Sequence, residues 1–170
     1  MSARAEPIDA EFQVEEDPER HRAELRLWLR LLTCANLIEA EIRTRLREQF
    51  NTTLPRFDLM AQLRRAPDGV LLGEVSRRMM VSTGNVTGLV ERLTQEGAIE
   101  RLVSERDRRA VRVRLTPRGR GQFNKMARVH SDWIAELLAD VAPDDQAALW
   151  SRLGGLKRSV RRVTHPEQDL

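Results

Sequence analysis

A long amphipathic helix near the N-terminus constrains the fold more than any other feature of this sequence. Between residues 19 and 49, apolar side chains recur at three- and four-residue steps, the spacing that places them on one face of an α-helix. This stripe comprises Leu25, Trp28, Leu29, Leu32, Ala35, Ile38, Ile42 and Leu46. A helix of about 30 residues is longer than a small globular domain covers by itself. The sequence therefore predicts a helix that packs against a second chain.

The C-terminal third repeats this pattern in two further segments. Thr116 followed by Pro117 is typical of a helix start, and Pro143 with two carboxylates after it is typical of a second one. The apolar face of the last helix comprises Leu149, Trp150, Leu153, Leu156, Val160 and Val163. We expect residues 19–50 and 117–165 to form a helical dimerisation region, preceded by an acidic, flexible N-terminus over residues 1–18.

The middle of the chain, residues 51–116, contains short elements. The first helix is expected to end at Asn51-Thr52-Thr53, which also caps the next helix. That second helix ends before the turn residues Pro67-Asp68-Gly69. Two short amphipathic helices follow, one over residues 72–79 and one that begins at Ser82 or Thr83. The second is expected to end at Gly97, because glycine favours the left-handed conformation at a helix end.

A β-hairpin with a charged tip comes next. Residues 99–103 and 110–115 are short candidate strands. In the second, Val111, Val113 and Leu115 alternate strictly with two arginines. The window 101–120 holds eight arginines against two acidic residues, a net charge of +6, whereas residues 1–24 carry −5. The whole chain carries only +3, so this concentrated basic segment indicates contact with a polyanion. A solvated arginine-rich face is the alternative interpretation.

Two short helices followed by an arginine-tipped hairpin predict a winged helix-turn-helix, a mainly α fold with a small β-hairpin wing. The second short helix presents small and hydrogen-bonding side chains at its N-terminal half, which suits entry into the major groove of DNA. The hairpin tip has the charge to reach an adjacent minor groove or its phosphates. The candidate DNA-binding residues are Ser82, Thr83, Gly84, Asn85, Thr87, Gly88, Arg92, Arg106, Arg108 and Arg109.

Several runs in this segment resemble the MarR family of winged helix-turn-helix transcriptional regulators. The most specific is Asp107-Arg108-Arg109-Ala110 followed by Leu115-Thr116 and Gly119, and Asn85-Val86-Thr87-Gly88-Leu89-Val90-Glu91-Arg92-Leu93 is a second one. The resemblance implies a homodimer that binds a pseudo-palindromic operator in double-stranded DNA, mostly as a repressor. It also implies that residues 82–93 form the recognition helix and that Arg108 or Arg109 is the wing contact.

Family members commonly release DNA when a small ligand, often an aromatic or phenolic acid, enters a pocket between the dimer helices and the DNA-binding lobe. The resemblance implies that the candidate ligand residues here are Trp28, Asn36, Phe57, Met60, Arg64, His130 and Trp133. Core packing of the histidine and the aromatic residues is the alternative interpretation. The stretch Asn51–Met60 further resembles regulators of aromatic-acid (hydroxycinnamate) catabolism, some of which bind coenzyme A thioesters.

Other function classes receive little support from the sequence. No nucleophile elbow, glycine-rich phosphate loop or clustered metal ligands are present, so we expect neither an enzyme nor a cofactor or metal site. No apolar stretch is long enough to cross a bilayer, and no secretory signal is recognisable. We therefore expect a cytoplasmic protein without membrane contact. Cys34 is expected to be a buried small hydrophobic residue, with a redox-sensing repressor as the alternative. A winged-helix protein-interaction module that does not bind DNA is the remaining alternative.

Overall fold

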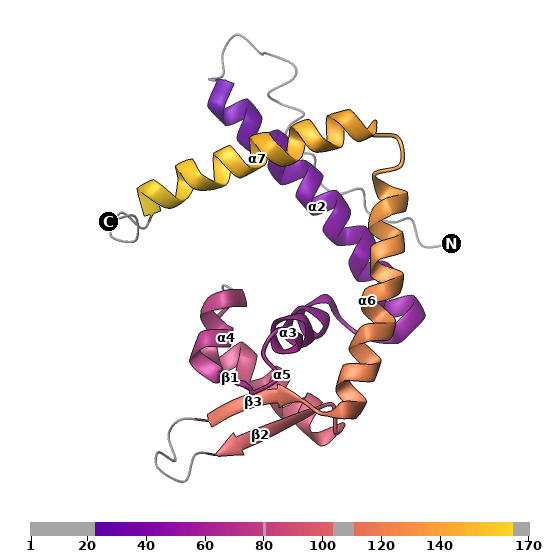
Figure 1. Cartoon of the computed structure of the whole chain (residues 1–170), viewed down its shortest axis with the longest axis vertical. Helices are drawn as coiled ribbons and strands as arrows, with labels where there is room; N and C mark the ends of the chain where they lie inside the picture. The colour runs from indigo at the N-terminus through magenta and orange to yellow at the C-terminus, as the bar shows by residue number, and fades with distance from the viewer. Residues whose placement is uncertain (1–22, 80, 104–110, 165–170) are drawn as a thin grey trace, which may run out of the picture. The chain divides into compact units, whose positions relative to one another are not determined.

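The computed structural model describes residues 23–79, 81–103 and 111–164 of the chain (Figure 1). Its elements are α2 (Ala23–Phe50), α3 (Leu54–Arg64), β1 (Val70–Leu71), α4 (Leu72–Met79), α5 (Thr83–Gln95), β2 (Ile99–Val103), β3 (Val111–Leu115), α6 (Pro117–Leu137) and α7 (Pro143–Thr164). The chain divides into two compact units, Met1–Ser131 and Asp132–Leu170, and the division falls within α6. The predicted fold class, mainly α with a small β wing, is confirmed.

The sheet of the first unit has three antiparallel strands in the order β1-β3-β2. The predicted hairpin is present, with Ile99 opposite Leu115 and Val103 opposite Val111. The sequence did not predict β1, because two residues are too few for apolar alternation to be recognised. Gly69 precedes β1 with φ +86, and its carbonyl accepts a 2.8 Å hydrogen bond from the Arg112 guanidinium. This bond joins the residue before β1 to the face of β3 that carries the arginines.

Three helices of the first unit, α3, α4 and α5, pack on one another and on this sheet. Their inward side chains are completely or almost completely buried, and so are Val70, Ile99, Val113 and Leu115 of the strands. The largest fully buried side chains are Leu46, Leu59, Leu63, Leu93, Ile99, Val70, Val75, Val86, Val90 and Val113. Because Leu46 lies in the last turns of α2, the C-terminal end of this helix belongs to the same core.

The helix ends follow the predicted capping residues. Asn51 adopts φ +48 directly after α2, and Gly97 adopts φ +70 after α5, so a left-handed residue ends both helices. Ser82 caps α5, and its side chain accepts a hydrogen bond from the Asn85 backbone N–H. Thr53 occupies the cap position of α3 but makes no side-chain cap hydrogen bond there.

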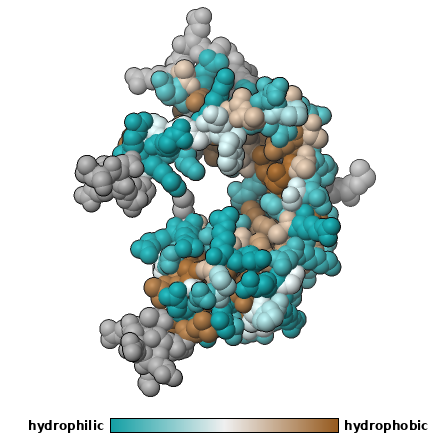
Figure 2. Space-filling view, viewed as in Figure 1, coloured by the Kyte–Doolittle hydropathy of each residue, from teal (hydrophilic) through white to brown (hydrophobic). Residues whose placement is uncertain are grey.

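The long helices carry apolar side chains that the described part of the chain leaves exposed. Of the residues in α2, only Ile42 and Leu46 are buried, and Trp28 is 56% exposed. None of the residues of α7 is buried, and Trp150 is 83% exposed. Figure 2 shows brown hydrophobic patches among the hydrophilic surface of the chain. No helix in the described ranges is long and apolar enough to cross a membrane.

Candidate nucleic-acid interface

Helix α5 has one buried face and one open face. Val86, Val90 and Leu93 fix its inner side in the core. The opposite side carries most of the predicted DNA-binding residues of this helix. Gly84, Asn85 and Arg92 are exposed there, and Thr87 and Gly88 are half-buried. Ser82 is exposed at the cap, and Thr83 is the first residue of the helix. The structure therefore brings these candidates together along one helix.

The two glycines of this helix are not required by the packing of the chain itself. A Cβ atom added to Gly84 or to Gly88 would meet no other atom within 4 Å, and neither residue has a positive φ. Glycine inside a helix costs about 1 kcal/mol relative to alanine. The result is a smooth outer surface on α5, which lets another molecule approach the helix backbone closely.

A shallow hollow of about 390 Å³ runs beside this surface. It is lined by Pro55, Met79, Val81, Gly84, Asn85, Gly88, Leu89 and Arg92. Asn85 and Arg92 supply hydrogen-bond donors to its lining, while Met79, Val81 and Leu89 contribute apolar side chains. This mixture of small, apolar and hydrogen-bonding groups resembles the residue set that contacts base edges and thymine methyl groups.

The connection between α4 and α5 is held by Ser76. Its hydroxyl donates a 2.6 Å hydrogen bond to the Val81 carbonyl, and the Val81 N–H donates to the Ser76 carbonyl at 3.3 Å. Ser76 is the only buried polar residue among the described residues. Sequence reasoning gave this serine no role, since its hydroxyl meets a residue beyond the end of its own helix.

The body of the wing is braced by ion pairs and hydrogen bonds between neighbouring elements. Glu100 on β2 lies opposite Arg114 on β3, and their side chains form a 2.8 Å ion pair. Arg101 lies 3.7 Å from Glu91 of α5, which links the wing to the outer face of that helix. The predicted wing contacts Arg106, Arg108 and Arg109 lie outside the described residues. Their contact with DNA stays a prediction.

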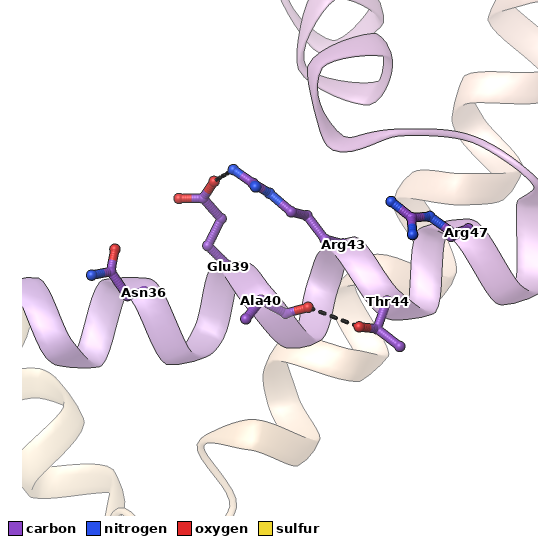
Figure 3. A pocket seen from close by; sticks show the side chains of 6 residues that line it. All are labelled: Asn36, Glu39, Ala40, Arg43, Thr44 and Arg47. Carbon is purple, nitrogen blue, oxygen red and sulfur yellow. Dashed lines mark hydrogen bonds and ion pairs between the residues drawn. The ribbon is translucent and has the colours of Figure 1, made fainter. Parts of the chain in front are cut away.

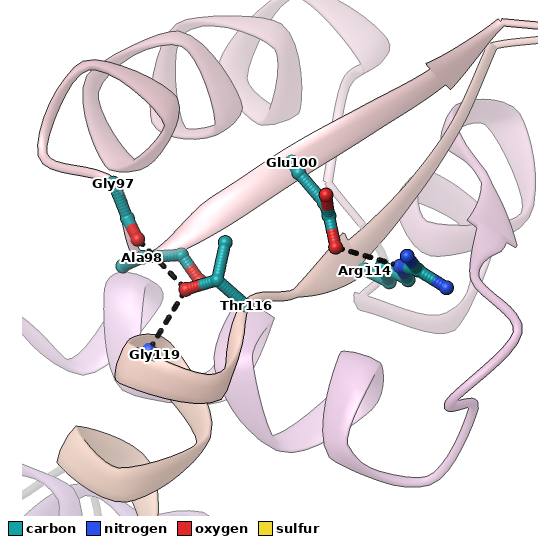
Figure 4. Close-up of polar contacts among 6 residues, drawn as sticks. All are labelled: Gly97, Ala98, Glu100, Arg114, Thr116 and Gly119. Carbon is teal, nitrogen blue, oxygen red and sulfur yellow. Dashed lines mark hydrogen bonds and ion pairs between the residues drawn. The ribbon is translucent and has the colours of Figure 1, made fainter.

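A compact junction joins the end of α5, the wing and the start of α6 (Figure 4). The Thr116 hydroxyl donates a 2.7 Å hydrogen bond to the Gly97 carbonyl and accepts a 3.0 Å bond from the Gly119 N–H. The Thr116 backbone N–H donates to the Ala98 carbonyl at 3.0 Å. A Cβ atom on Gly119 would lie 1.9 Å from the Ala98 carbonyl oxygen. The predicted cap at Thr116 is therefore confirmed, and Gly119 is sterically required.

The predicted ligand-binding residues are distributed over α2, α3 and α6. The rings of Phe57 and His130 stack with centroids 4.9 Å apart, and Arg64 Nε donates a 3.2 Å hydrogen bond to Asn124. Met60 lines a different hollow, of about 460 Å³. Trp28 is exposed on α2, and Trp133 is buried on α6. Phe57 and His130 are thus two of the seven that contact each other.

Asn36 lies in a third place, a hollow of about 380 Å³ along α2. Figure 3 shows its side chain on the same side of the helix as Glu39, Arg43 and Arg47, where Arg43 forms an ion pair with Glu39. Burial, and then the Glu39 carboxylate, raise the pKa of Asp58 on α3. This face of α2 is therefore polar and charged.

The single chain by itself does not bury Cys34. We expected a buried small hydrophobic residue within the apolar stripe of the first helix, but the thiol is exposed in the described chain. Periodicity places Cys34 correctly on α2, yet burial within α2 is confined to its C-terminal turns. The position of a residue on a helix does not establish that another element covers it.

Comparisons with known proteins place the chain in a family. The model of the MarR family matches residues 50–110. The transcriptional activatory protein BadR of Rhodopseudomonas palustris is 32% identical over 123 residues, which are 71% of this chain and 70% of BadR. A crystal structure of a MarR family transcriptional regulator from Silicibacter pomeroyi superimposes with a TM-score of 0.70 at 32% identity, covering 84% of this chain and 98% of that one. The chain belongs to the MarR family.

A further structural relative concerns the interface directly. The MarR-family chain resembles FabT of Streptococcus pneumoniae, solved in complex with DNA, with a TM-score of 0.68 and 25% identity, over 82% of this chain and 99% of FabT. The similar proteins are transcriptional regulators, which confirms the expectation that the chain is not an enzyme. The family resemblance noted in the sequence is confirmed as well.

The environment of His130 predicts that the stability of the folded chain depends on pH. Burial lowers the pKa of His130 below its ordinary value of 6.5, so the unfolded chain binds the proton more readily than the folded chain. The stabilisation from neutral His130 is complete above pH 6.5 and is lost as the pH falls below it. We expect the free energy of unfolding to decrease with acidification, and His130→Phe to reduce this slope while keeping a ring against Phe57.

Urea denaturation of both proteins at pH values above and below 6.5 measures that slope. The offset in stability between the two proteins is not the readout, because the substitution also removes the other interactions of the imidazole. Equal slopes for the parent and His130→Phe would show that His130 does not carry the effect.

Proposed function

We propose that this MarR-family regulator is a homodimeric repressor that a small ligand releases from a pseudo-palindromic operator in double-stranded DNA. Residues 51–116 act as the winged helix-turn-helix lobe, and residues 19–50 and 117–165 form the dimerisation region. Such a function places the protein in the cytoplasm with the DNA. The open face of α5 is the observation that carries the proposal.

The recognition surface is the outer side of α5 with its cap. Gly84 and Gly88 leave room for the edge of the major groove, and Asn85 can form a bidentate pair with adenine. Ser82, Thr83 and Thr87 contact phosphates or bases near the helix N-terminus, where backbone N–H groups and the helix dipole attract anions. Arg92 and the wing arginines Arg106, Arg108 and Arg109 supply the remaining positive charge. The resemblance to FabT, solved in complex with DNA, supports this assignment.

The dimer follows from the exposed apolar side chains of the long helices. Leu149, Leu153, Leu156 and Val160 follow one face of α7, and all are exposed in the single chain. Large exposed apolar surfaces on monomers usually mark an interface. A second copy of the chain would cover these residues and set two recognition helices about 34 Å apart, which is one turn of DNA.

The family resemblance favours repression over activation, although BadR is named as an activatory protein. The ligand that we propose is an aromatic or phenolic acid or its coenzyme A thioester. The stacked pair of Phe57 and His130 supports this class, because it presents aromatic surface beside a hydrogen-bonding imidazole. Arg64 carries a guanidinium suited to a carboxylate or phosphate. Asn36, Met60, Trp28 and Trp133 complete the proposed ligand set.

Salt dependence of duplex binding tests the DNA-binding function. We expect the operator affinity of the parent to fall steeply with rising salt, because phosphate contacts release counterions. Arg108→Ala and Arg109→Ala together should weaken binding by at least about tenfold and reduce the slope of log K against log salt by about one per lost contact. Arg128→Ala on the exposed side of α6 serves as the matched control and should leave both quantities unchanged.

Fluorescence anisotropy with a labelled duplex at several salt concentrations measures these values. A parent protein that binds no duplex, or binds with no salt dependence, would favour the alternative of a protein-interaction module. If the wing variants bind like the parent, the assignment of Arg108 and Arg109 as DNA contacts is contradicted, but the DNA-binding function itself is not.

A further inference from the structure

Ser76 places a hydroxyl group inside the lobe, at a position where a helix is usually apolar. It belongs to α4 and is 7% exposed, and it is the only buried polar or charged residue among the residues that the structure describes. Serine is a weaker helix former than alanine, and a buried hydroxyl costs free energy unless it is hydrogen-bonded. The hydrogen bonding of Ser76 therefore offsets two unfavourable contributions.

Ser76 holds Val81 through both polar groups of the Val81 backbone. The Ser76 hydroxyl donates to the Val81 carbonyl at 2.6 Å, and the Val81 N–H donates to the Ser76 carbonyl at 3.3 Å. Two bonds between the same two residues fix orientation as well as position, because a rotation that keeps one bond breaks the other. The chain segment that enters α5 is thereby tied to α4.

The residue that Ser76 holds adjoins the start of the proposed recognition helix. Val81 directly precedes Ser82, whose side chain caps α5 by accepting a hydrogen bond from the Asn85 N–H. Val81 and Asn85 also line the same hollow beside α5. The other end of α5 is fixed in the core by Leu93. A rotation at Val81 therefore moves the cap and the first turn of α5 against a fixed end.

We propose that Ser76 is a positioning residue for operator recognition, which sets the angle at which α5 meets the bases. The inference rests on the proposed function, since it concerns the helix assigned there to the major groove. Hydrogen bonds to base edges tolerate only a narrow range of distances and angles, so a small displacement of α5 removes them. Arginine contacts with phosphates tolerate such a displacement, because charge attraction is long-range and the side chains are flexible. Ser76 thus controls sequence preference more than total affinity.

Amide hydrogen exchange, followed by NMR, tests the positioning role without any DNA. Ser76→Ala removes one hydroxyl, and alanine suits a buried helical position, so the variant folds. We expect the amides of Val81 and Asn85 to exchange at least about tenfold faster than in the parent. The amide of Ala98, which bonds to a carbonyl at the other end of α5, should exchange as in the parent.

Operator preference is the functional readout. A duplex that the parent selects from a random-sequence library serves as the operator, and a scrambled version of it serves as the reference. Ser76→Ala should lower the ratio of the two affinities by at least about tenfold. The slope of log K against log salt on the scrambled duplex should stay unchanged. Ser76→Thr keeps the hydroxyl and should retain the ratio of the parent.

Thr94→Ala is the matched control. The Thr94 hydroxyl also donates to a backbone carbonyl, that of Val90 at 2.7 Å, but this bond lies within the C-terminal half of α5. Its removal leaves Val81 tied to Ser76, so the operator preference and the exchange of the Val81 amide should equal those of the parent. Equal losses in both alanine variants would indicate a general response to a lost hydroxyl and would contradict the positioning role.

The results separate this inference from the function on which it rests. If the parent prefers its operator and Ser76→Ala keeps that preference, the positioning role alone is overturned. The same conclusion follows if the Val81 amide of Ser76→Ala exchanges at the parent rate, or if Ser76→Thr loses the preference as Ser76→Ala does. A parent that selects no duplex sequence overturns the proposed function, and the role of Ser76 in recognition is then overturned with it.

Discussion

Gly119→Ala is expected to destabilise the winged helix-turn-helix lobe by about 3 kcal/mol or more. The new Cβ would lie 1.9 Å from the Ala98 carbonyl oxygen and 2.8 Å from its carbon. These are backbone atoms, and the same carbonyl accepts the hydrogen bond from the Thr116 N–H, so the neighbour cannot move aside without breaking the junction. Guanidinium denaturation at matched protein concentrations measures the loss, since the stability of the proposed dimer would depend on concentration.

Gly121→Ala is the matched control for this prediction. Gly121 lies two residues further along α6, and a Cβ there would meet nothing within 4 Å. Because alanine is the better helix former, this variant should equal the parent or gain up to about 1 kcal/mol. A Gly119→Ala protein that loses less than about 1 kcal/mol would mean that the junction is not rigid.

The helix ends of this fold were predictable because capping chemistry acts over short distances. The side chains of Ser82 and Thr116 accept hydrogen bonds from backbone N–H groups three residues later in the chain. Gly97 ends its helix through its own left-handed backbone conformation. The same reasoning does not reach Gly119. Its requirement for glycine comes from Ala98, which is 21 residues earlier in the chain and becomes a neighbour only after the sheet has formed.

Burial on the long helices was less predictable than their existence. An apolar stripe specifies which residues share a face, but it does not specify whether the same chain covers that face. Cys34 and Trp28 share α2 with Ile42 and Leu46, and only the latter two are buried. For α7, the sequence predicted an apolar face that a second chain covers, and this face is exposed in the single chain.

The candidate site shows the same division between local and distant information. The outer face of α5 follows from helical periodicity alone, because burying Val86 and Val90 turns Gly84, Asn85 and Gly88 outward. The ion pair between Arg56 of α3 and Glu96 at the end of α5 joins residues 40 positions apart, and no local pattern marks it. Sequence reasoning therefore found the surface of one helix and missed its contact with another.

Gly88→Leu is expected to abolish specific DNA binding while leaving the lobe folded. Its Cβ would meet no atom within 4 Å, and leucine favours the helix over glycine, so stability should be unchanged or rise by up to about 1 kcal/mol. The isobutyl group would stand beside Asn85 and Leu89 on the surface proposed to enter the major groove. Losing one or two base contacts there corresponds to a decrease in affinity of about 100-fold. Duplex-binding titrations paired with thermal melts measure both quantities.

Gly121→Leu makes the same chemical change on an exposed and equally open position of α6, and it should bind DNA like the parent. The pair separates an effect on recognition from a general effect of adding an apolar side chain. Because the wing arginines remain, Gly88→Leu should keep salt-sensitive, non-specific binding and lose only the preference for the operator over a scrambled duplex. A Gly88→Leu protein that retains this preference would mean that α5 does not approach the bases closely, and the reason for an unpacked glycine on its outer face would then lie outside DNA recognition.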